Sequence, residues 1–158
     1  MDLLKVPKRY IPDVLTKKDR KKQKKNLRKS RKLYKKGKYF SRPKVKSFKS
    51  RKSNHLKRAE KLYNVENIKP SKELAKQTKC SKEALEKIVS KGRGAYFSSG
   101  SRPNQTAESW GLARLASSIS GGNASIVDYH ILKDGCKPNS KALKLARKTC
   151  KEQNKTCN

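Results

Sequence analysis

Apolar residues recur at helical spacing through much of this 158-residue chain. Leu56, Ala59 and Leu62 are three residues apart, which places them on one face of a helix. Similar runs follow further on, and each comes after a serine or threonine that can cap a helix N-terminus. We therefore predict short helices that begin after Ser53, Ser71, Ser81, Thr106 and Ser140. The helix after Thr106 is apolar around most of its circumference and is expected to be the most buried.

Two stretches depart from this pattern. Residues 92–105 are rich in glycine and serine, which predicts a loop. Residues 124–133 are β-branched and predict a strand. The expected fold is mainly α, α+β at most. It consists of an extended or helical basic N-terminal arm, one small helical domain with a short strand element, and a basic C-terminal helix.

In the first 58 residues, charge replaces the apolar pattern. They contain 25 Lys and Arg against three acidic residues. Thr16 and Asp19 resemble a capping box, and Gly37 suits a C-terminal cap, so a helix is predicted over residues 17–36. Few of its residues are apolar, and like charges stand at i, i+4. We expect this helix to be partly formed alone and to become stable on a polyanion.

The whole chain carries a formal net charge of +32, from 44 Lys and Arg against 12 Asp and Glu. Leu, Ile, Val and Phe make up fewer than a fifth of the residues, so the core is expected to be small. The charge is concentrated, because residues 92–136 are almost neutral. We divide the chain into a basic arm with one long polar helix (1–52), a small globular domain with a helical hairpin, a Gly/Ser-rich loop and a buried helix (53–137), and a basic C-terminal helix or tail (138–158).

Such a concentration of cations is typical of surfaces that bind nucleic acid. Tyr39 and Phe40 are interleaved with the cations, as in proteins that combine phosphate contact with base stacking. The same rings could instead attach the arm to the body. The candidate nucleic-acid-binding residues are Lys17, Lys18, Arg20, Lys21, Lys22, Lys24, Lys25, Arg28, Lys29, Arg31, Lys32, Tyr39, Phe40 and Arg42.

Residues 73–88 resemble a repressor-type helix-turn-helix. Leu74, Leu85 and Ile88 stand where that motif needs apolar residues. Lys79 occupies the turn position that requires a positive φ and is normally glycine. The second helix would present charges of mixed sign, without the Arg, Asn or Gln that usually read bases. We therefore favour two short helices packed into a small core over a sequence-specific reader.

The glycine-rich stretch also offers a candidate anion site. A Gly/Ser-rich loop that leads into a helix N-terminus can hold a phosphate, and Arg93, Arg102 and Thr106 are the residues that would form such a site. The alternative is that these residues only build tight turns. We favour the alternative, because the Gly-Lys-Ser/Thr of a phosphate-binding P-loop is missing.

Cysteine usage and catalytic patterns exclude several classes of function. Cys80, Cys136, Cys150 and Cys157 lack the spacing of a zinc half-site, and no metal or other cofactor is expected. No apolar stretch could span a bilayer, and the first residues lack the apolar region of a secretory signal. We therefore expect free thiols in a reducing compartment. Nucleophile–base pairs and paired carboxylates are missing at catalytic spacings, so the chain is expected not to be an enzyme.

A resemblance to a known family rests on three parts of the chain. They are Pro7-Lys8-Arg9-Tyr10, Leu15-Thr16-Lys17-Lys18-Asp19, and the run Gly94-Ala95-Tyr96-Phe97-Ser98-Ser99-Gly100-Ser101-Arg102-Pro103-Asn104-Gln105-Thr106 with Ser109-Trp110-Gly111 and Ala113-Arg114-Leu115-Ala116. Over residues 5–137 the chain is similar to an uncharacterised family of small basic proteins encoded by large double-stranded DNA viruses of algae and by some phages. The resemblance implies a viral origin and a location in the virion, or in the host nucleus or cytoplasm during infection. It supplies no catalytic residues.

The leading hypothesis is a non-enzymatic virion protein that binds nucleic acid, namely duplex DNA, largely independently of sequence and condenses the genome. The alternative is a minor capsid protein whose basic arm binds acidic capsid surfaces or membrane headgroups, with viral capsid proteins as partners. The sequence leaves open whether the partner is DNA, RNA or an acidic protein surface, and it also leaves open the stage of infection and the oligomeric state.

Overall fold

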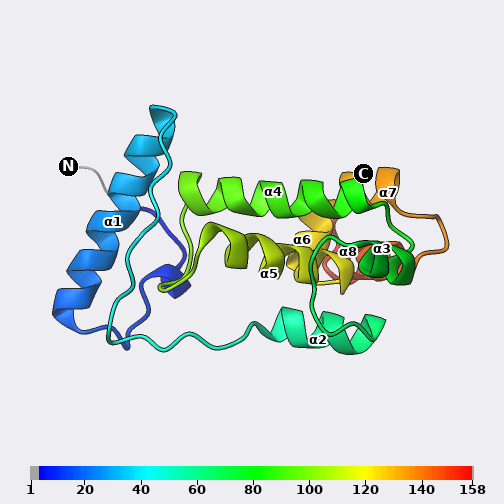
Figure 1. Cartoon of the computed structure of the whole chain (residues 1–158), viewed down its shortest axis with the longest axis horizontal. Helices are drawn as coiled ribbons and strands as arrows, with labels where there is room; N and C mark the ends of the chain where they lie inside the picture. Colours follow the sequence, from blue (N-terminus) through cyan, green and yellow to red (C-terminus); the bar gives the residue numbers. More distant parts are fainter. Residues whose placement is uncertain (1–3, 158) are drawn as a thin grey trace. The chain divides into compact units, whose positions relative to one another are not determined.

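The computed structural model describes residues 4–157, and the regular structure within them is helical (Figure 1). A short 3-10 helix, Lys8–Tyr10, precedes the α-helices. These are α1 (Lys17–Lys35), α2 (Asn54–Tyr63), α3 (Lys72–Thr78), α4 (Lys82–Ser98), α5 (Ala107–Ile119), α6 (Asn123–Val127), α7 (Tyr129–Gly135) and α8 (Lys141–Glu152). The predicted mainly α fold is confirmed.

Six of these helices begin at the capping residues predicted from the sequence. At the starts of α4 and α5, the Ser81 and Thr106 hydroxyls accept hydrogen bonds from the Ala84 and Ser109 backbone N–H groups. The Thr16 hydroxyl accepts a hydrogen bond from the Asp19 backbone N–H at 3.2 Å, at the start of α1. Ser53, Ser71 and Ser140 accept equivalent bonds at the starts of α2, α3 and α8. Each bond satisfies a backbone donor that has no partner inside its helix. Local sequence is therefore sufficient to set these starts.

The predicted strand at residues 124–133 is wrong, because these residues belong to α6 and α7. Ser125, Asp128 and Leu132 are buried, at the three- and four-residue spacing of a helix face. The preference of β-branched residues for strands depends on neighbouring strands that cover them. Here α6 and α7 pack against α8 instead, and this tertiary contact overrides the local preference.

The predicted glycine-serine loop is wrong in its first half, since α4 continues to Ser98 and includes Gly92 and Gly94. A Cβ on Gly92 would lie 2.5 Å from the Gly111 Cα, and one on Gly111 would lie 2.7 Å from the Val89 carbonyl oxygen. Side chains at Gly92 and Gly111 would therefore collide with backbone. These two glycines permit a close approach of α4 and α5, rather than a turn.

Gly92→Ala is expected to lower the free energy of unfolding by about 1–3 kcal/mol, because the added methyl group would push α4 and α5 apart. Gly94→Ala is the matched control on the same helix, since nothing lies within 4 Å of the position its Cβ would take. Alanine there should leave stability unchanged or raise it by up to about 1 kcal/mol. Urea unfolding followed by circular dichroism measures both, and equal stabilities of the two variants would contradict the packing argument.

Two compact units divide the described chain. The first contains residues 4–51 and 93–110, and the second contains residues 52–92 and 111–157. In the first unit, the basic N-terminal segment packs with the residues around Gly100. The Tyr10 and Trp110 rings meet edge to face at 5.8 Å, and a Cβ on Gly100 would lie only 2.9 Å from Leu27. The basic segment is therefore packed into a small folded unit.

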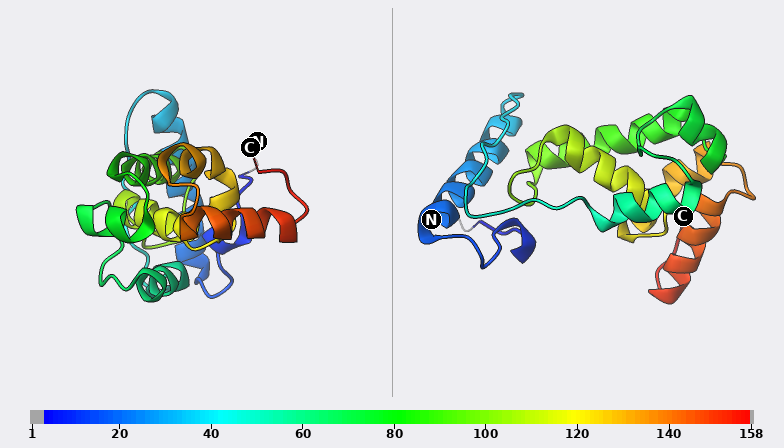
Figure 2. Two further views of the ribbon diagram at one scale, coloured as in Figure 1. Left: turned by 90° about the vertical axis from the view of Figure 1, so that its right-hand side faces the viewer. Right: turned by 60° about the horizontal axis from the view of Figure 1, so that its bottom comes forward.

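The second unit holds an apolar cluster to which α2, α3, α7, α8 and parts of α4 and α5 contribute. Its side chains with no exposed surface include Ala59, Leu74, Leu85, Ile88, Val89, Leu115, Ala116, Ile119, Leu132, Ala142 and Ala146. The Tyr63 hydroxyl donates to the Ile119 carbonyl at 2.5 Å, and burial raises the pKa of Tyr63. Helices α6, α7 and α8 pack against one another at one end of this unit (Figure 2).

The turn between α3 and α4 has the geometry of the helix-turn-helix motif, although Lys79 counted against the match in the sequence. Lys79 has a φ of 58°, the left-handed conformation that the turn requires. Leu74, Leu85 and Ile88 are fully buried. The hairpin therefore forms part of the core, as favoured above, while base reading by its second helix stays untested.

The expectation of free thiols is wrong, because the cysteines pair as Cys80–Cys136 and Cys150–Cys157. The first disulfide joins the turn between α3 and α4 to the end of α7, and the second joins α8 to the segment that follows it. Both lie in the second unit. Partners 56 residues apart cannot be recognised from spacing, because pairing depends on proximity in the fold.

Candidate nucleic-acid interface

Helix α1 and the residue that caps its C-terminus present ten exposed cations on one side. At about 100° per residue, these positions fall within a sector of about 140°. We call this set the α1 basic face: Lys17, Lys18, Lys21, Lys22, Lys25, Arg28, Lys29, Lys32, Lys35 and Lys36. The first eight were predicted from the sequence. Lys35 and Lys36 were missed, although the helical period alone would have placed them on the same face.

The opposite side of α1 is buried, and this is what orients the basic face. Gln23, Leu27 and Ser30 are buried there. The Gln23 side-chain amide donates to the Tyr10 carbonyl at 3.1 Å, and the Ser30 hydroxyl donates to the Phe97 carbonyl at 3.1 Å. Only one of these three inward residues is apolar. A search for an apolar stripe therefore underestimates how firmly α1 is held.

The segment after Gly37 returns alongside α1 (Figure 1) and fastens to it. The Lys22 ammonium donates to the Lys44 carbonyl at 3.1 Å, and the Asp19 carboxylate accepts from the Ser47 hydroxyl and backbone N–H. These Ser47 bonds hold the pKa of Asp19 below its usual range. Asp19 is the only acidic residue between positions 14 and 59, and it is occupied by this contact. This single carboxylate, which also interacts electrostatically with Lys18 and Lys22, offsets only a small part of the charge of the basic face.

Arg42, one of the binding residues suggested by the sequence, is buried. Its side chain is 8% exposed and donates to the Ser30 and Ser101 hydroxyls and to the Tyr96 carbonyl, at 2.7–2.8 Å. Its guanidinium lies 3.8 Å from the centroid of the Tyr96 ring. Burial lowers the pKa of Arg42, which has no acidic partner within these contacts. This cation holds the first unit together and cannot reach a phosphate.

Arg20, Lys24 and Arg31 are half-buried at the border of the face. Arg20 lies 3.6 Å from the Asp13 carboxylate, and Arg31 donates to the Ser99 and Lys5 carbonyls. Their charge still contributes to the field around α1. The ten residues of the basic face are more exposed than these three.

The aromatic residues predicted to stack on bases differ in exposure. Tyr39 is 72% exposed, and its ring lies 5.0 Å from that of Phe97. Phe40 is half-buried, with the Lys29 ammonium 4.4 Å from its ring centroid. Of the two predicted rings, only Tyr39 presents most of its surface to solvent.

The residues of the candidate anion site are used within the protein. Arg93 pairs with Glu108 at 2.7 Å, and the Thr106 hydroxyl accepts from the Ser109 N–H at 3.0 Å, while Arg102 stays exposed. The neighbouring Asn104 side chain binds the backbone of residues 45–48 through three hydrogen bonds. These contacts agree with the architectural alternative for this loop. Phosphate binding there stays untested.

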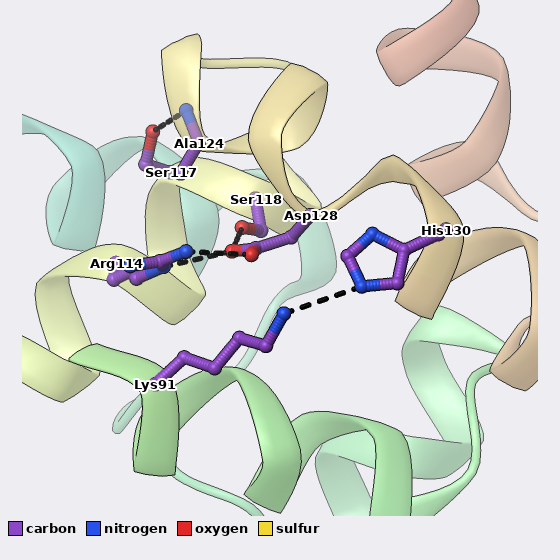
Figure 3. Close-up of polar contacts among 7 residues, drawn as sticks. All are labelled: Lys91, Arg114, Ser117, Ser118, Ala124, Asp128 and His130. Carbon is purple, nitrogen blue, oxygen red and sulfur yellow. Dashed lines mark hydrogen bonds and ion pairs between the residues drawn. The ribbon is translucent and has the colours of Figure 1, made fainter. Parts of the chain in front are cut away.

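A second polar cluster lies in the second unit (Figure 3). The buried Asp128 carboxylate accepts two bonds from Arg114, at 2.7 and 2.9 Å, and one from the Ser118 hydroxyl at 2.9 Å. The Asp128 carboxylate is directed toward Arg114, away from His130, and the His130 Nε2 lies 3.2 Å from the Lys91 ammonium. Serine, aspartate and histidine are therefore close without forming the relay of a hydrolase, in which the histidine bridges the other two. The cluster joins α5 to the junction of α6 and α7.

A family model described as a family of unknown function, DUF5824, matches residues 7–151. The chain belongs to this family. The DUF5824 match begins before α1 and ends within α8, so it includes the whole α1 basic face and the Asp128 cluster. Membership bears out the resemblance to an uncharacterised family, while the viral origin stays a prediction. No curated protein and no solved structure matches the chain.

Neither a membrane-spanning helix nor a metal-binding cluster is found in the described part of the chain. Within residues 4–157, no helix has both the length and the apolar character needed to cross a bilayer. The same residues contain no group of three or more His, Cys, Asp or Glu side chains placed to hold a metal ion. The strongest chemical feature described for this family member is the concentrated positive charge on α1.

Proposed function

We propose that this chain is a non-enzymatic protein that binds duplex DNA through the α1 basic face, largely independently of sequence. The observation that carries the proposal is the segregation of ten exposed cations onto one side of a helix whose other side is buried. A helix held in this way presents its charges without first having to fold. Little ordering entropy then opposes contact with phosphates.

Charge density supports a polyanion as the ligand. A helix of 19 residues is roughly 28 Å long, at about 1.5 Å per residue, and the basic face runs along its whole length. Duplex DNA carries one negative charge per about 1.7 Å of its axis, so a surface of this length meets many phosphates. The face has lysines and one arginine but no Asn or Gln, which favours backbone contact over base reading.

The family resemblance described above supports a setting for this activity. In a virus with a double-stranded DNA genome, such a protein would neutralise and condense DNA within the particle. The alternative setting is a minor capsid protein, in which the same face would bind an acidic capsid surface or membrane headgroups. Both roles use the α1 basic face. They differ in whether duplex DNA or an acidic capsid or membrane surface binds more tightly to it.

Salt dependence tests the proposal most directly. If about ten phosphates are contacted, the logarithm of the binding constant for duplex DNA should fall with log salt at a slope of about −9. Replacing Lys18, Lys21, Lys25 and Lys32 by Gln should reduce the slope by about 3.6. If the two binding lines meet near 1 M salt, this weakens binding by roughly 3.6 log units, about 4,000-fold, at about 0.1 M salt. Fluorescence anisotropy with a labelled duplex measures both quantities.

The matched control removes the same charge from the second unit. Lys57, Lys61, Lys72 and Lys76 are exposed on α2 and α3, and their replacement by Gln should change the slope by less than one. Equal losses in the two variants would show that net charge matters and the α1 basic face does not. Absence of binding by the unaltered chain at about 50 mM salt would reject DNA as the ligand. Tighter binding to anionic lipid vesicles or capsid shells would favour the alternative.

A further inference from the structure

Helix α8, in the second unit, presents another segregated set of cations. Five of its exposed residues are basic, and at about 100° per residue they fall within a sector of about 120°. We call them the α8 basic face: Lys141, Lys144, Arg147, Lys148 and Lys151. Residues 137–157 contain one acidic residue, Glu152, at the end of the helix. None of the residues proposed above as DNA contacts lies here.

The other side of α8 is firmly packed, which fixes the direction of this face. Ala142, Leu143, Ala146 and Cys150 are buried. Helix α8 packs against both α6 and α7, as the views in Figure 2 show. The Thr149 hydroxyl adds a hydrogen bond to the Gly121 carbonyl at 2.6 Å. The cations therefore project from a rigid support, as they do on α1.

The tail after α8 is held to the same helix. Cys157 forms a disulfide with Cys150, and the Lys155 backbone N–H donates to the Cys150 carbonyl at 2.8 Å. The Arg147 guanidinium donates to the Tyr129 hydroxyl at 3.2 Å, so one cation of the face is positioned by α7. The remaining four are lysines with exposed side chains, suited to contact phosphate as point charges.

We infer that the α8 basic face is a second DNA-binding site, and that the chain bridges two duplex segments by binding one through α1 and another through α8. This inference rests on the proposed function, because it assumes that α1 binds DNA. Each face belongs to a different compact unit and has its own set of buried residues behind it. Two such faces on one chain would convert binding into cross-linking, which brings distant DNA segments together.

A sandwich capture experiment tests the bridging. One duplex is immobilised on beads, the full-length protein is added near 0.1 M salt, and capture of a second, fluorescent duplex is measured. The unaltered chain should capture it. In a variant with Lys141, Lys144, Lys148 and Lys151 replaced by Gln, the amount of second duplex captured should fall about tenfold or more. The affinity of this variant for a single duplex should fall no more than a few-fold. The variant with Lys57, Lys61, Lys72 and Lys76 replaced by Gln serves again as the control. It should capture as much of the second duplex as the unaltered chain does.

The outcomes separate this inference from the proposed function. If the unaltered chain binds no duplex at all, the proposed function fails. If it binds one duplex and the α8 variant captures a second as well as before, the second site is rejected and α1 binding stands. Bridging by paired copies of the chain through α1 alone would give that same result. If the α8 variant fails to bind even a single duplex while the control variant binds it, α1 and α8 contribute to one shared binding surface. That outcome would also reject two separate sites.

A second variant covers the case in which the fourfold substitution disturbs folding. Glu152→Gln removes the one acidic group at the end of the α8 basic face and is exposed, so it should leave the fold intact. Capture of the second duplex should rise by a few-fold, and single-duplex affinity should hardly change. Unchanged or reduced capture by this variant would count against the α8 site.

Discussion

Replacing Asp128 by Ala is expected to lower the free energy of unfolding by about 3–5 kcal/mol, because it removes one partner of a buried ion pair. Asp128 has no exposed surface and binds both Arg114 and Ser118. Without the carboxylate, the Arg114 guanidinium would stay partly buried with no counter-charge, and its hydrogen-bond donors would lose their acceptors. The hydrogen bond from Arg114 to Asp128 raises the pKa of this arginine in the unaltered chain, and the variant loses that contribution. The guanidinium nevertheless keeps its charge, because arginine is not deprotonated in proteins.

Urea unfolding of the unaltered chain and of the Asp128→Ala variant gives this difference. The double variant Asp128→Ala, Arg114→Met tests its cause, since removing both charges should recover a large part of the loss. If the double variant is as unstable as the sum of the single ones, the ion pair is not the source of the effect. A single variant within about 0.5 kcal/mol of the unaltered chain would contradict the description of the cluster.

Arg42→Met is expected to cost about 2–4 kcal/mol of stability in the first unit. The substitution removes three charge-assisted hydrogen bonds, each worth about 1.5–3 kcal/mol, while the cost of burying the charge is also removed. The Ser30 and Ser101 hydroxyls and the Tyr96 carbonyl would lose a donor. The contact of the guanidinium with the Tyr96 ring would be lost as well.

The same variant tests whether Arg42 has a structural role or contacts DNA. At a temperature where it stays folded, Arg42→Met should keep the salt dependence of duplex binding within one unit of slope, because Arg42 does not face solvent. Lys46→Met, at an exposed position of the same segment, serves as the stability control and should change unfolding by less than about 0.5 kcal/mol. A stable Arg42→Met variant that binds DNA weakly would return this residue to the interface.

Local sequence predicted the features that depend on neighbouring residues. Thr16, Ser53 and Ser140 cap helices because their hydroxyls reach a backbone N–H only two or three residues away. The buried face of α8 also follows from spacing alone, since its inward residues are small or apolar and every outward neighbour is charged.

Features that depend on distant partners could not be predicted in this way. Gly92 is typical of a turn until its neighbour in space, Gly111, is known. Arg42 resembles its neighbouring cations in sequence, and only the three acceptors contributed by α1 and residues 96–101 distinguish it. For the candidate site, charge and helical period were enough to locate the outward face of α1. The inward face of α1 could not be predicted from an apolar pattern, because two of its three buried residues are polar.

The interruption of the first unit by the second limits how the molecule can be divided. Its two stretches are separated in the chain by residues 52–92, so no single cut releases the unit that carries the α1 basic face whole. A peptide that ends near residue 51 would lack Tyr96 and Phe97, whose carbonyls receive Arg42 and Ser30. Its helix would lose the anchorage that aims the lysines in one direction. Binding measured with such a peptide would reflect a flexible chain of cations. Only the uncut molecule presents these cations fixed on one side of a helix.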